Sequence, residues 1–265
     1  MHRIGSWLCC LSLGLALVPR IHAQAELVQV VPPQVRVPPP SPTATPEELE
    51  KKGDELRSEK AYLDALDYYS AAISKAPTAR LYNKSGIAQL QLRREKESER
   101  DFQKALKVDA SFADSWNNLG VVYYEQRKYG KAIKQYDKAI KISPNVASFH
   151  SNMGAAYFGK KNWEKATTCY AQALQLDPQL FERSSRVGVT AQLPSPQDRS
   201  RFNYLVARLY AKTGDREHAL EYLRRAMEEG YKGINDVYKD PEFAALRGDT
   251  RFTQLMASKP AAVPE

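Results

Sequence analysis

The sequence predicts an all-α protein, an α-solenoid of stacked antiparallel helix pairs that ends in short C-terminal capping helices. From residue 46 onward the apolar side chains recur with the 3.6-residue period of a helix. The same pattern returns about every 34 residues. The composition, 43% apolar and 26% charged in 265 residues, is that of a globular chain, and three cysteines are too few for a disulfide scaffold.

The first 25 residues have the order of a secretory signal peptide. A basic start, Met1–Arg3, precedes the uncharged stretch Ile4–Val18, and small residues at Ala23 and Ala25 offer cleavage sites. The stretch has about 15 residues, whereas a membrane-spanning helix needs roughly 20. We therefore expect a periplasmic or secreted protein cleaved after Ala23 or Ala25, with retention of the stretch as an anchor as the alternative.

Residues 26–45 contain six prolines, which favour an extended polyproline conformation and exclude a helix. We interpret this segment as a Pro-rich linker, and a ligand for a proline-recognising domain is the alternative. Cleavage of the signal peptide would leave Cys169 as the one thiol, so no intramolecular disulfide could form. We expect Cys169 to be packed rather than reactive.

The clearest repeat unit begins at Ala113. Its places 4, 7, 8, 11, 20, 24, 27 and 32 hold Trp116, Leu119, Gly120, Tyr123, Ala132, Tyr136, Ala139 and Pro144. The next unit, from Ala147, places His150, Met153, Gly154, Tyr157, Ala166, Tyr170, Ala173 and Pro178 in the same order. Places 4, 8 and 11 share a face of a first helix, and places 20, 24 and 27 share a face of a second helix. Glycine and alanine let the two helices approach closely, and the proline ends the second helix.

This arrangement resembles the tetratricopeptide repeat, and the resemblance covers roughly residues 46–231 in about five units. The other three units begin near Pro46, at Ala79 and near Ser200. The unit from Ala79 departs most clearly at Gln89, where place 11 should be apolar or aromatic. The last unit is degenerate and has Tyr231 in the place of its terminal proline.

The repeats divide the chain into segments. Four units occupy residues 46–180, residues 181–199 form an insertion loop with two prolines, and residues 200–257 hold the degenerate fifth unit and the capping helices. Asp240 followed by Pro241 is a helix start, and Asp249 could begin one more helix. We expect these short helices to cover the apolar face of the fifth unit, and residues 258–265 to be a flexible tail.

The resemblance implies a protein–protein interaction module that binds an extended peptide in a concave groove along the first helices. Asn118 and Asn152 share place 6, which is similar to the asparagine ladder of O-GlcNAc-transferase-type superhelices, and we expect neither residue to pack in the core. The expected groove residues are Asn83, Asn117, Asn118, Tyr124, Asn152, Phe158, Tyr204 and Arg208.

The ends of this groove differ in charge. Arg201 and Arg208 belong to unit five, whereas Glu47, Glu50 and Asp54 belong to unit one. A bound segment should therefore place its acidic end towards unit five. The acids of unit one also argue against the lysine and asparagine clamp with which chaperone-binding members of the family hold a terminal carboxylate.

A second candidate surface is a basic ridge at the turns between first and second helices, made by Lys60, Arg93, Arg94, Arg127, Lys128, Lys160 and Lys161. Such turns are usually just solvated. The alternative function is an envelope-associated structural protein that makes peripheral contact with an anionic surface, either phospholipid or an acidic polymer. Nucleic acid is not expected, since loss of Arg3 and Arg20 lowers the formal charge from +8 to +6.

We expect no enzyme, no cofactor and no metal site. After the signal peptide the histidines are His150 and His218, with no metal-ligand spacing, and His150 stands on a packing place. Nucleotide-binding glycine motifs and a nucleophile elbow are absent from the sequence. A hydrolase that uses paired surface carboxylates stays open as an alternative, although no residue cluster supports it.

Overall fold

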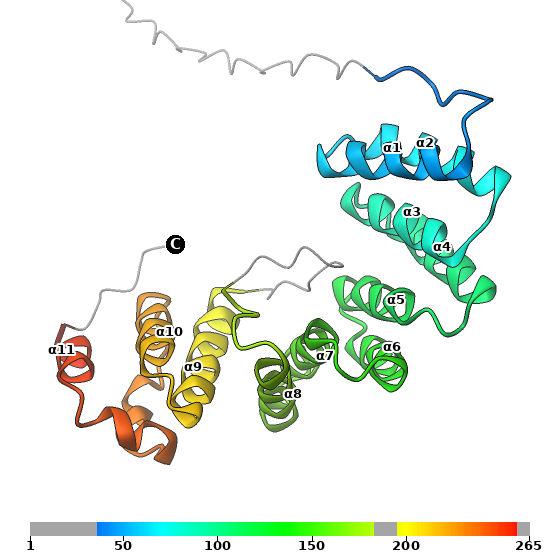
Figure 1. Ribbon diagram of the computed structural model, residues 1–265. Coiled ribbons are helices and arrows are strands. Elements are labelled where there is room, and N and C mark those ends of the chain that lie inside the picture. The colour runs from blue at the N-terminus through cyan, green and yellow to red at the C-terminus, as the bar shows by residue number, and fades with distance from the viewer. Residues whose placement is uncertain (1–35, 183–194, 259–265) are drawn as a thin grey trace, which may run out of the picture. The chain divides into compact units, whose positions relative to one another are not determined.

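The computed structural model describes residues 36–182 and 195–258. The predicted signal peptide, the first half of the Pro-rich linker, the centre of the insertion and the predicted tail after Ser258 lie outside the described residues. Within the described part, the structure is built from helices without strands, which confirms the predicted all-α class (Figure 1).

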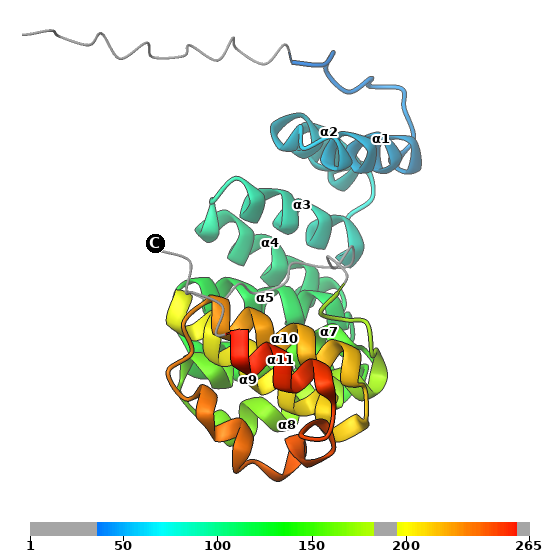
Figure 2. The same cartoon turned by 90° about the vertical axis from the view of Figure 1, so that its left-hand side faces the viewer.

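In residues 36–182 and 195–258, ten α-helices form five antiparallel pairs, one for each repeat unit (Figures 1 and 2). The pairs are α1 (Pro46–Ser58) with α2 (Tyr62–Lys75), α3 (Ala79–Gln91) with α4 (Glu95–Val108), α5 (Ala113–Glu125) with α6 (Tyr129–Ile142), α7 (Ala147–Gly159) with α8 (Trp163–Leu176), and α9 (Pro196–Thr213) with α10 (Arg216–Glu228). Two 3₁₀ helices, η1 (Ile234–Tyr238) and η2 (Pro241–Leu246), and the helix α11 (Thr250–Ser258) follow the last pair.

Each of the first four pairs packs an aromatic ring of the second helix on a glycine of the first. A Cβ on Gly53 would lie 2.6 Å from Cε1 of Tyr69, and one on Gly120 would lie 2.6 Å from Cδ1 of Tyr136. The equivalent contacts join Gly86 to Phe102 and Gly154 to Tyr170. All four rings are at most 1% exposed. Glycine is required at these positions because any side chain would occupy the space of the ring.

Lysines of the second helices lie over aromatic rings of the first helices. The ammonium of Lys138 is 3.9 Å from the centre of the Trp116 ring. The ammonium of Lys131 lies 5.6 Å from the centre of the Tyr123 ring, and that of Lys165 lies 5.5 Å from the centre of the Tyr157 ring. Cations over aromatic faces are attracted by the ring quadrupole. The aromatic residues at places 4 and 11 therefore join the two helices of a unit.

The turn inside each pair has the same backbone structure. Its central residue has a positive φ, from 57° to 64° at Lys60, Arg93, Arg127 and Lys161, and 83° at Gly214. The following residue donates its N–H to the carbonyl five residues earlier, at 2.8–3.0 Å. This pattern is the Schellman motif, which pairs carbonyls that the end of the first helix leaves free.

Successive pairs stack through α2 on α3, α4 on α5, and α6 on α7. The contact of α8 with α9 is less extensive, and it follows the insertion. Three rings hold this junction, because the Phe202 ring centre lies 5.2 Å from that of Tyr170 and 5.3 Å from that of Phe181. The Tyr210 hydroxyl also donates to the carbonyl of Pro178 at 2.8 Å.

The C-terminal helices cover the fifth unit. Phe243 and Leu246 of η2 and Phe252 of α11 are at most 2% exposed, in one apolar cluster with Val206 and Leu223 of the α9–α10 pair. Such caps are needed because the last repeat of a stack otherwise exposes the apolar face that a further repeat would cover. In the part of the chain that the structure describes, no helix has the length and apolar character needed to cross a membrane.

Candidate interaction site

Most of the residues predicted to line a peptide groove are buried. Asn117, Asn118 and Asn152 are at most 2% exposed, and Phe158 is 1% exposed. Asn83, Tyr124 and Tyr204 are buried as well, while Arg208 is half-buried. The expectation that Asn118 and Asn152 do not pack is therefore wrong. Sequence spacing placed them off the glycine–ring face, but it does not show what neighbouring units contribute.

The four asparagines form one chain of hydrogen bonds across three first helices, which we call the amide network. Asn118 donates to Oδ1 of Asn83 at 3.0 Å, and Asn117 donates to Oδ1 of Asn118 at 3.1 Å. Asn152 donates to Oδ1 of Asn117 at 2.9 Å. The network therefore connects α3, α5 and α7. Because buried amides need partners, these side chains bond to one another rather than to solvent.

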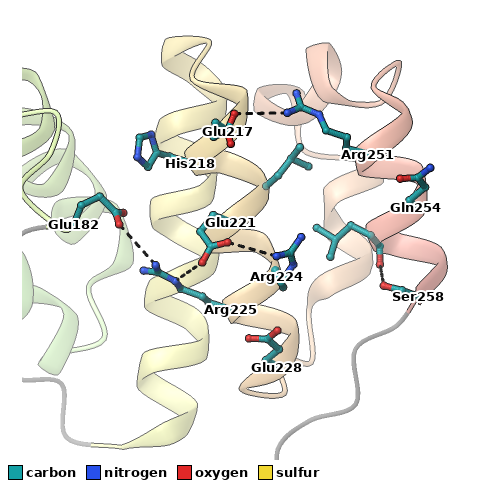
Figure 3. A pocket seen from close by; sticks show the side chains of 12 residues that line it. Glu182, Glu217, His218, Glu221, Arg224, Arg225, Glu228, Arg251, Gln254 and Ser258 are labelled. Atoms are coloured by element: carbon teal, nitrogen blue, oxygen red, sulfur yellow. Dashed lines mark hydrogen bonds and ion pairs between the residues drawn. The ribbon is translucent and has the colours of Figure 1, made fainter.

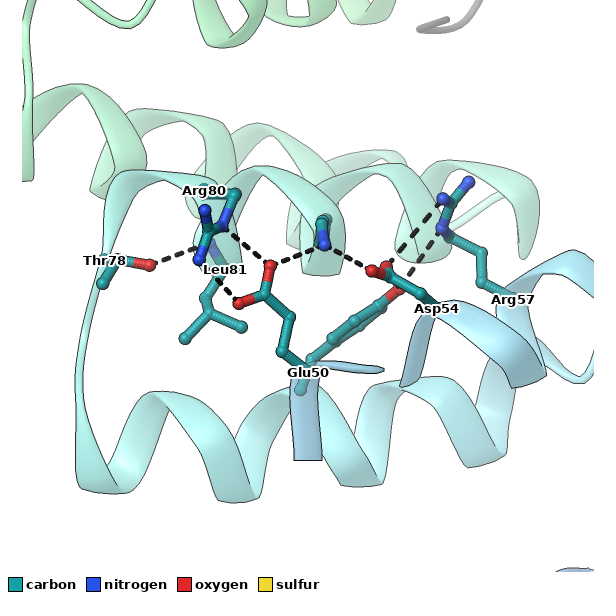
Figure 4. A network of polar contacts seen from close by, with 8 residues as sticks. Glu50, Asp54, Arg57, Thr78, Arg80 and Leu81 are labelled. Carbon is teal, nitrogen blue, oxygen red and sulfur yellow. Dashed lines mark hydrogen bonds and ion pairs between the residues drawn. The ribbon is translucent and has the colours of Figure 1, made fainter. Parts of the chain in front are cut away.

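At the predicted acidic end of unit one, Glu50 and Asp54 are paired with cations of unit two (Figure 4), while Glu47 stays exposed. Glu50 accepts from Arg80 at 2.8 Å and from Lys84 at 2.5 Å, and Lys84 also reaches Asp54 at 2.5 Å. The hydroxyl of Tyr69 donates to Asp54 at 2.8 Å. Burial, together with this bond to a carboxylate, raises the pKa of Tyr69 well above its ordinary value.

The predicted basic end at unit five is paired with the capping segment. Arg208 donates to Glu242 at 2.8 Å and lies 3.4 Å from a carboxylate oxygen of Asp240. The Tyr204 hydroxyl donates to the same carboxylate at 2.5 Å. Arg201 stays exposed, with its guanidinium 4.6 Å from the centre of the Trp163 ring. The predicted orientation of a bound segment therefore loses most of its electrostatic basis.

All seven residues of the predicted basic ridge are exposed. The side chain of Arg93 is 82% exposed and forms an ion pair with Glu125 at 3.3 Å. Among the described residues, the other six ridge cations have no carboxylate within ion-pair distance. The ridge therefore offers positive charge that the described part of the chain leaves largely unpaired.

The structure adds a cleft of about 850 Å³ at the C-terminal end, lined by α10, α11 and Glu182 (Figure 3). Leu220 and Leu255 supply its apolar lining, and ion pairs cross it. Arg225 of α10 pairs with Glu182 at 3.7 Å, and Glu217 of α10 pairs with Arg251 of α11 at 3.7 Å. Sequence reasoning missed this cleft, because acids and arginines on one helix also describe an ordinary solvated surface.

Cys169 and His150, which could in principle take part in catalysis or bind a metal, are both packed inside the protein. Cys169 is buried, and burial raises the pKa of its thiol to about 11, so the reactive thiolate is scarce near neutral pH. His150 is also buried, with Nε2 2.7 Å from the carbonyl oxygen of Pro144. The described residues contain no group of three or more acids, histidines or cysteines arranged to hold a metal ion.

Family models of the tetratricopeptide repeat match the chain at residues 79–112, 102–134, 147–180 and 200–229, and a TPR repeat model matches residues 122–161. No curated protein matches the sequence. These models reach both the regular units and the degenerate fifth unit.

Solved structures with similar folds include three proteins. PilF of Pseudomonas aeruginosa is 17% identical, with a TM-score of 0.54 over 80% of this chain and 97% of that chain. MamA is 24% identical with a TM-score of 0.46 over 56% of this chain and 79% of that one. YrrB, described as a TPR protein with an unusual peptide-binding site, is 19% identical with a TM-score of 0.47 over 72% of this chain and 90% of that one. The five helix pairs and the family models agree, and the chain belongs to the tetratricopeptide repeat family.

Proposed function

We propose that the chain is an exported protein-interaction module that binds an extended partner segment along its first helices. The observation that carries this proposal is the stack of tetratricopeptide units itself, since the family is built around repeated helix faces. A repeated face suits an extended segment because each unit can contact a successive part of it.

The amide network and the paired charges narrow the surface that a partner can use. On α3, Arg80 and Gln91 are exposed and Ile87 is half-buried, whereas the expected groove residue Asn83 is buried. On this helix a partner therefore contacts the exposed Arg80 and Gln91, and Asn83 lies in the wall behind them. This assignment replaces the direct amide contact that the sequence predicts.

Site-specific photocrosslinking tests the proposal. A photoreactive side chain at Gln91 should capture a partner in the envelope fraction, with the crosslink mapped to one segment of that partner. The matched control places the same group at Lys107, which is exposed on the second helix α4. Equal capture at both positions, or capture at Lys107 alone, would move binding away from the first helices.

The exported state is tested separately. Fractionation should place the mature chain in the periplasm or the medium, and N-terminal sequencing should begin at Gln24 or Glu26. An intact N-terminus on a membrane-bound chain would favour the retained anchor instead.

A second candidate function is peripheral docking on an anionic surface, and the exposed, largely unpaired cations of the basic ridge favour it. Binding through such a surface is screened by salt, because the Debye length falls to about 3 Å at 1 M ionic strength. Salt should therefore release the chain from an anionic surface, and retention of the chain in high salt would contradict this function.

A further inference from the structure

Four residues of the basic ridge share an unusual backbone conformation. Lys60, Arg93, Arg127 and Lys161 each have φ between 57° and 64°, and we call them the left-handed cations. This region of φ disfavours residues with a Cβ and is the ordinary place of glycine. The chain itself shows the glycine solution, because Gly214 occupies the same position in unit five with φ of 83°.

Backbone geometry does not explain why cations occupy these positions. The same Schellman hydrogen bonds form at Gly214 as at the other four turns, so the turn needs no side chain. If only the first helix were present, the negative end of its dipole would stabilise a cation at this position. However, the second helix begins within two residues of each left-handed cation, and its positive end offsets that attraction.

Local ion pairs do not explain the cations either. Arg93 has an acidic partner, Glu125, and it is still 82% exposed. Among the described residues, Lys60, Arg127 and Lys161 have no carboxylate within ion-pair distance. The same turns carry the acids Glu59, Glu95 and Glu125, but the exposed cations outnumber them, since Arg94, Lys128 and Lys160 stand next to the left-handed residues.

We infer that the left-handed cations form a contact row for an anionic phospholipid bilayer. This inference rests on the second candidate function and names its partner and its residues. The row presents one long, exposed cationic side chain in each of the first four units, and the neighbouring Arg94, Lys128 and Lys160 add a second cation in three of them. Lipid headgroups can diffuse beneath such a row, so a bilayer needs no matching register, whereas a rigid partner would. Each lysine or arginine near an anionic bilayer adds to the attraction, so the row acts through its number of charges.

Glycine substitution tests the inference because it removes the charge and suits the backbone. The test variant combines Lys60→Gly, Arg93→Gly, Arg127→Gly and Lys161→Gly in the mature chain. The control variant removes the same charge from exposed second-helix positions, with Lys104→Gln, Lys107→Gln, Lys134→Gln and Lys141→Gln. Circular dichroism should give the same helicity for the parent chain and both variants.

Co-sedimentation measures binding to vesicles of phosphatidylcholine with and without phosphatidylglycerol. The parent chain should bind only the vesicles that contain phosphatidylglycerol. The glycine variant should bind these vesicles roughly 100-fold or more weakly than the parent, and the glutamine control should lose far less affinity. Equal losses in the two variants would show that net charge, and not the row, matters, which overturns the inference but keeps the second candidate function. If the parent chain does not bind anionic vesicles, both the inference and docking on a bilayer are overturned. This holds whether or not the chain binds soluble polyphosphate.

Discussion

The middle and the ends of the repeat stack connect each first helix to the segment beside it with different kinds of polar group. In the middle, neutral amides connect α3 to α5 and α5 to α7 through Asn83, Asn118, Asn117 and Asn152. At the N-terminal end, ion pairs of Glu50 and Asp54 connect α1 to α3. At the C-terminal end, Arg208 connects α9 to the capping segment.

This difference follows burial. The side chain of Lys84 is 20% exposed and that of Arg208 is 29% exposed, whereas Asn117, Asn118 and Asn152 are almost fully buried. Desolvating a charge costs far more than desolvating an amide, so charged pairs suit the better hydrated ends and amides suit the middle. We call these residues of the first helices the polar stripe: Glu50, Asp54, Asn83, Asn117, Asn118, Asn152, Tyr204 and Arg208. Their polar groups hold neighbouring segments together and are therefore largely occupied before a partner binds.

The largest predicted effect breaks the middle of the stack. Gly120→Leu forces a side chain into the space of the Tyr136 ring and should lower the free energy of unfolding by about 3 kcal/mol or more. A defect in a central unit also weakens its contacts with both neighbours. Thermal and urea denaturation measure the loss.

The control for this substitution is Gly130→Leu on α6. A Cβ on Gly130 would meet no atom within 4 Å, so the change in stability should be about 1 kcal/mol or less. Equal effects of the two substitutions would show that the packing of glycine on the ring does not limit the stability of unit three.

A smaller effect is expected from opening the amide network. Asn118→Ala removes the acceptor of Asn117 and leaves its buried amide N–H without a partner, whereas Oδ1 of Asn83 loses one donor but still accepts from the Ser115 hydroxyl. The free energy of unfolding should fall by about 2 kcal/mol, within the range for unsatisfied buried groups. Asn145→Ala, at an exposed turn, should change it by less than about 0.5 kcal/mol. An unchanged midpoint for Asn118→Ala would mean that the network contributes nothing to stacking.

The charged ends should respond to salt, and the amide network should not. Lys84→Gln removes the cation shared by Glu50 and Asp54 and should cost about 1 kcal/mol at low ionic strength. In about 1 M salt this cost should shrink, because ionic screening weakens the pair in the parent chain. The cost of Asn118→Ala should stay the same in both conditions. A salt-independent cost at Lys84 would contradict the division between ends and middle.

The helix pairs can be predicted from the sequence because their signals are local. Glycine at place 8 and a ring at place 24 belong to one unit, and Gly120 with Tyr136 behaves as that spacing predicts. The partners on the polar stripe belong to different units. Asn118 bonds to Asn83, 35 positions away, and Tyr204 bonds to Asp240, 36 positions away.

The sequence therefore indicates which residues share this face of the first helices, but not the neighbouring units that bury most of them. Periodicity gives the face on which Asn118 and Arg208 lie, but it cannot show whether that face meets solvent, a partner or the next unit. The left-handed conformation of Lys60 and Arg127 was likewise hidden, because their side chains suit any exposed turn.

A further effect of about 1 kcal/mol distinguishes two tyrosines that occupy the same place in different units. Tyr69, in the second helix of unit one, donates its hydroxyl to Asp54 at 2.8 Å and accepts from Arg57 at 3.2 Å. Tyr136, in unit three, is equally buried, and its hydroxyl has no hydrogen-bond partner among the described residues. The neutral middle of the stack offers that hydroxyl nothing to bond, whereas the charged end offers two groups.

Replacing each tyrosine by phenylalanine should therefore have opposite effects. Tyr136→Phe removes an unsatisfied buried hydroxyl while keeping the ring on Gly120, and stability should rise by about 1 kcal/mol. Tyr69→Phe keeps the ring on Gly53 but removes two hydrogen bonds, and stability should fall by about 1 kcal/mol. Urea denaturation of both variants measures the difference between them, about 2 kcal/mol, which is easier to resolve than either change alone. If both substitutions shift stability in the same direction, the polar surroundings of the hydroxyl do not distinguish the end of the stack from its middle.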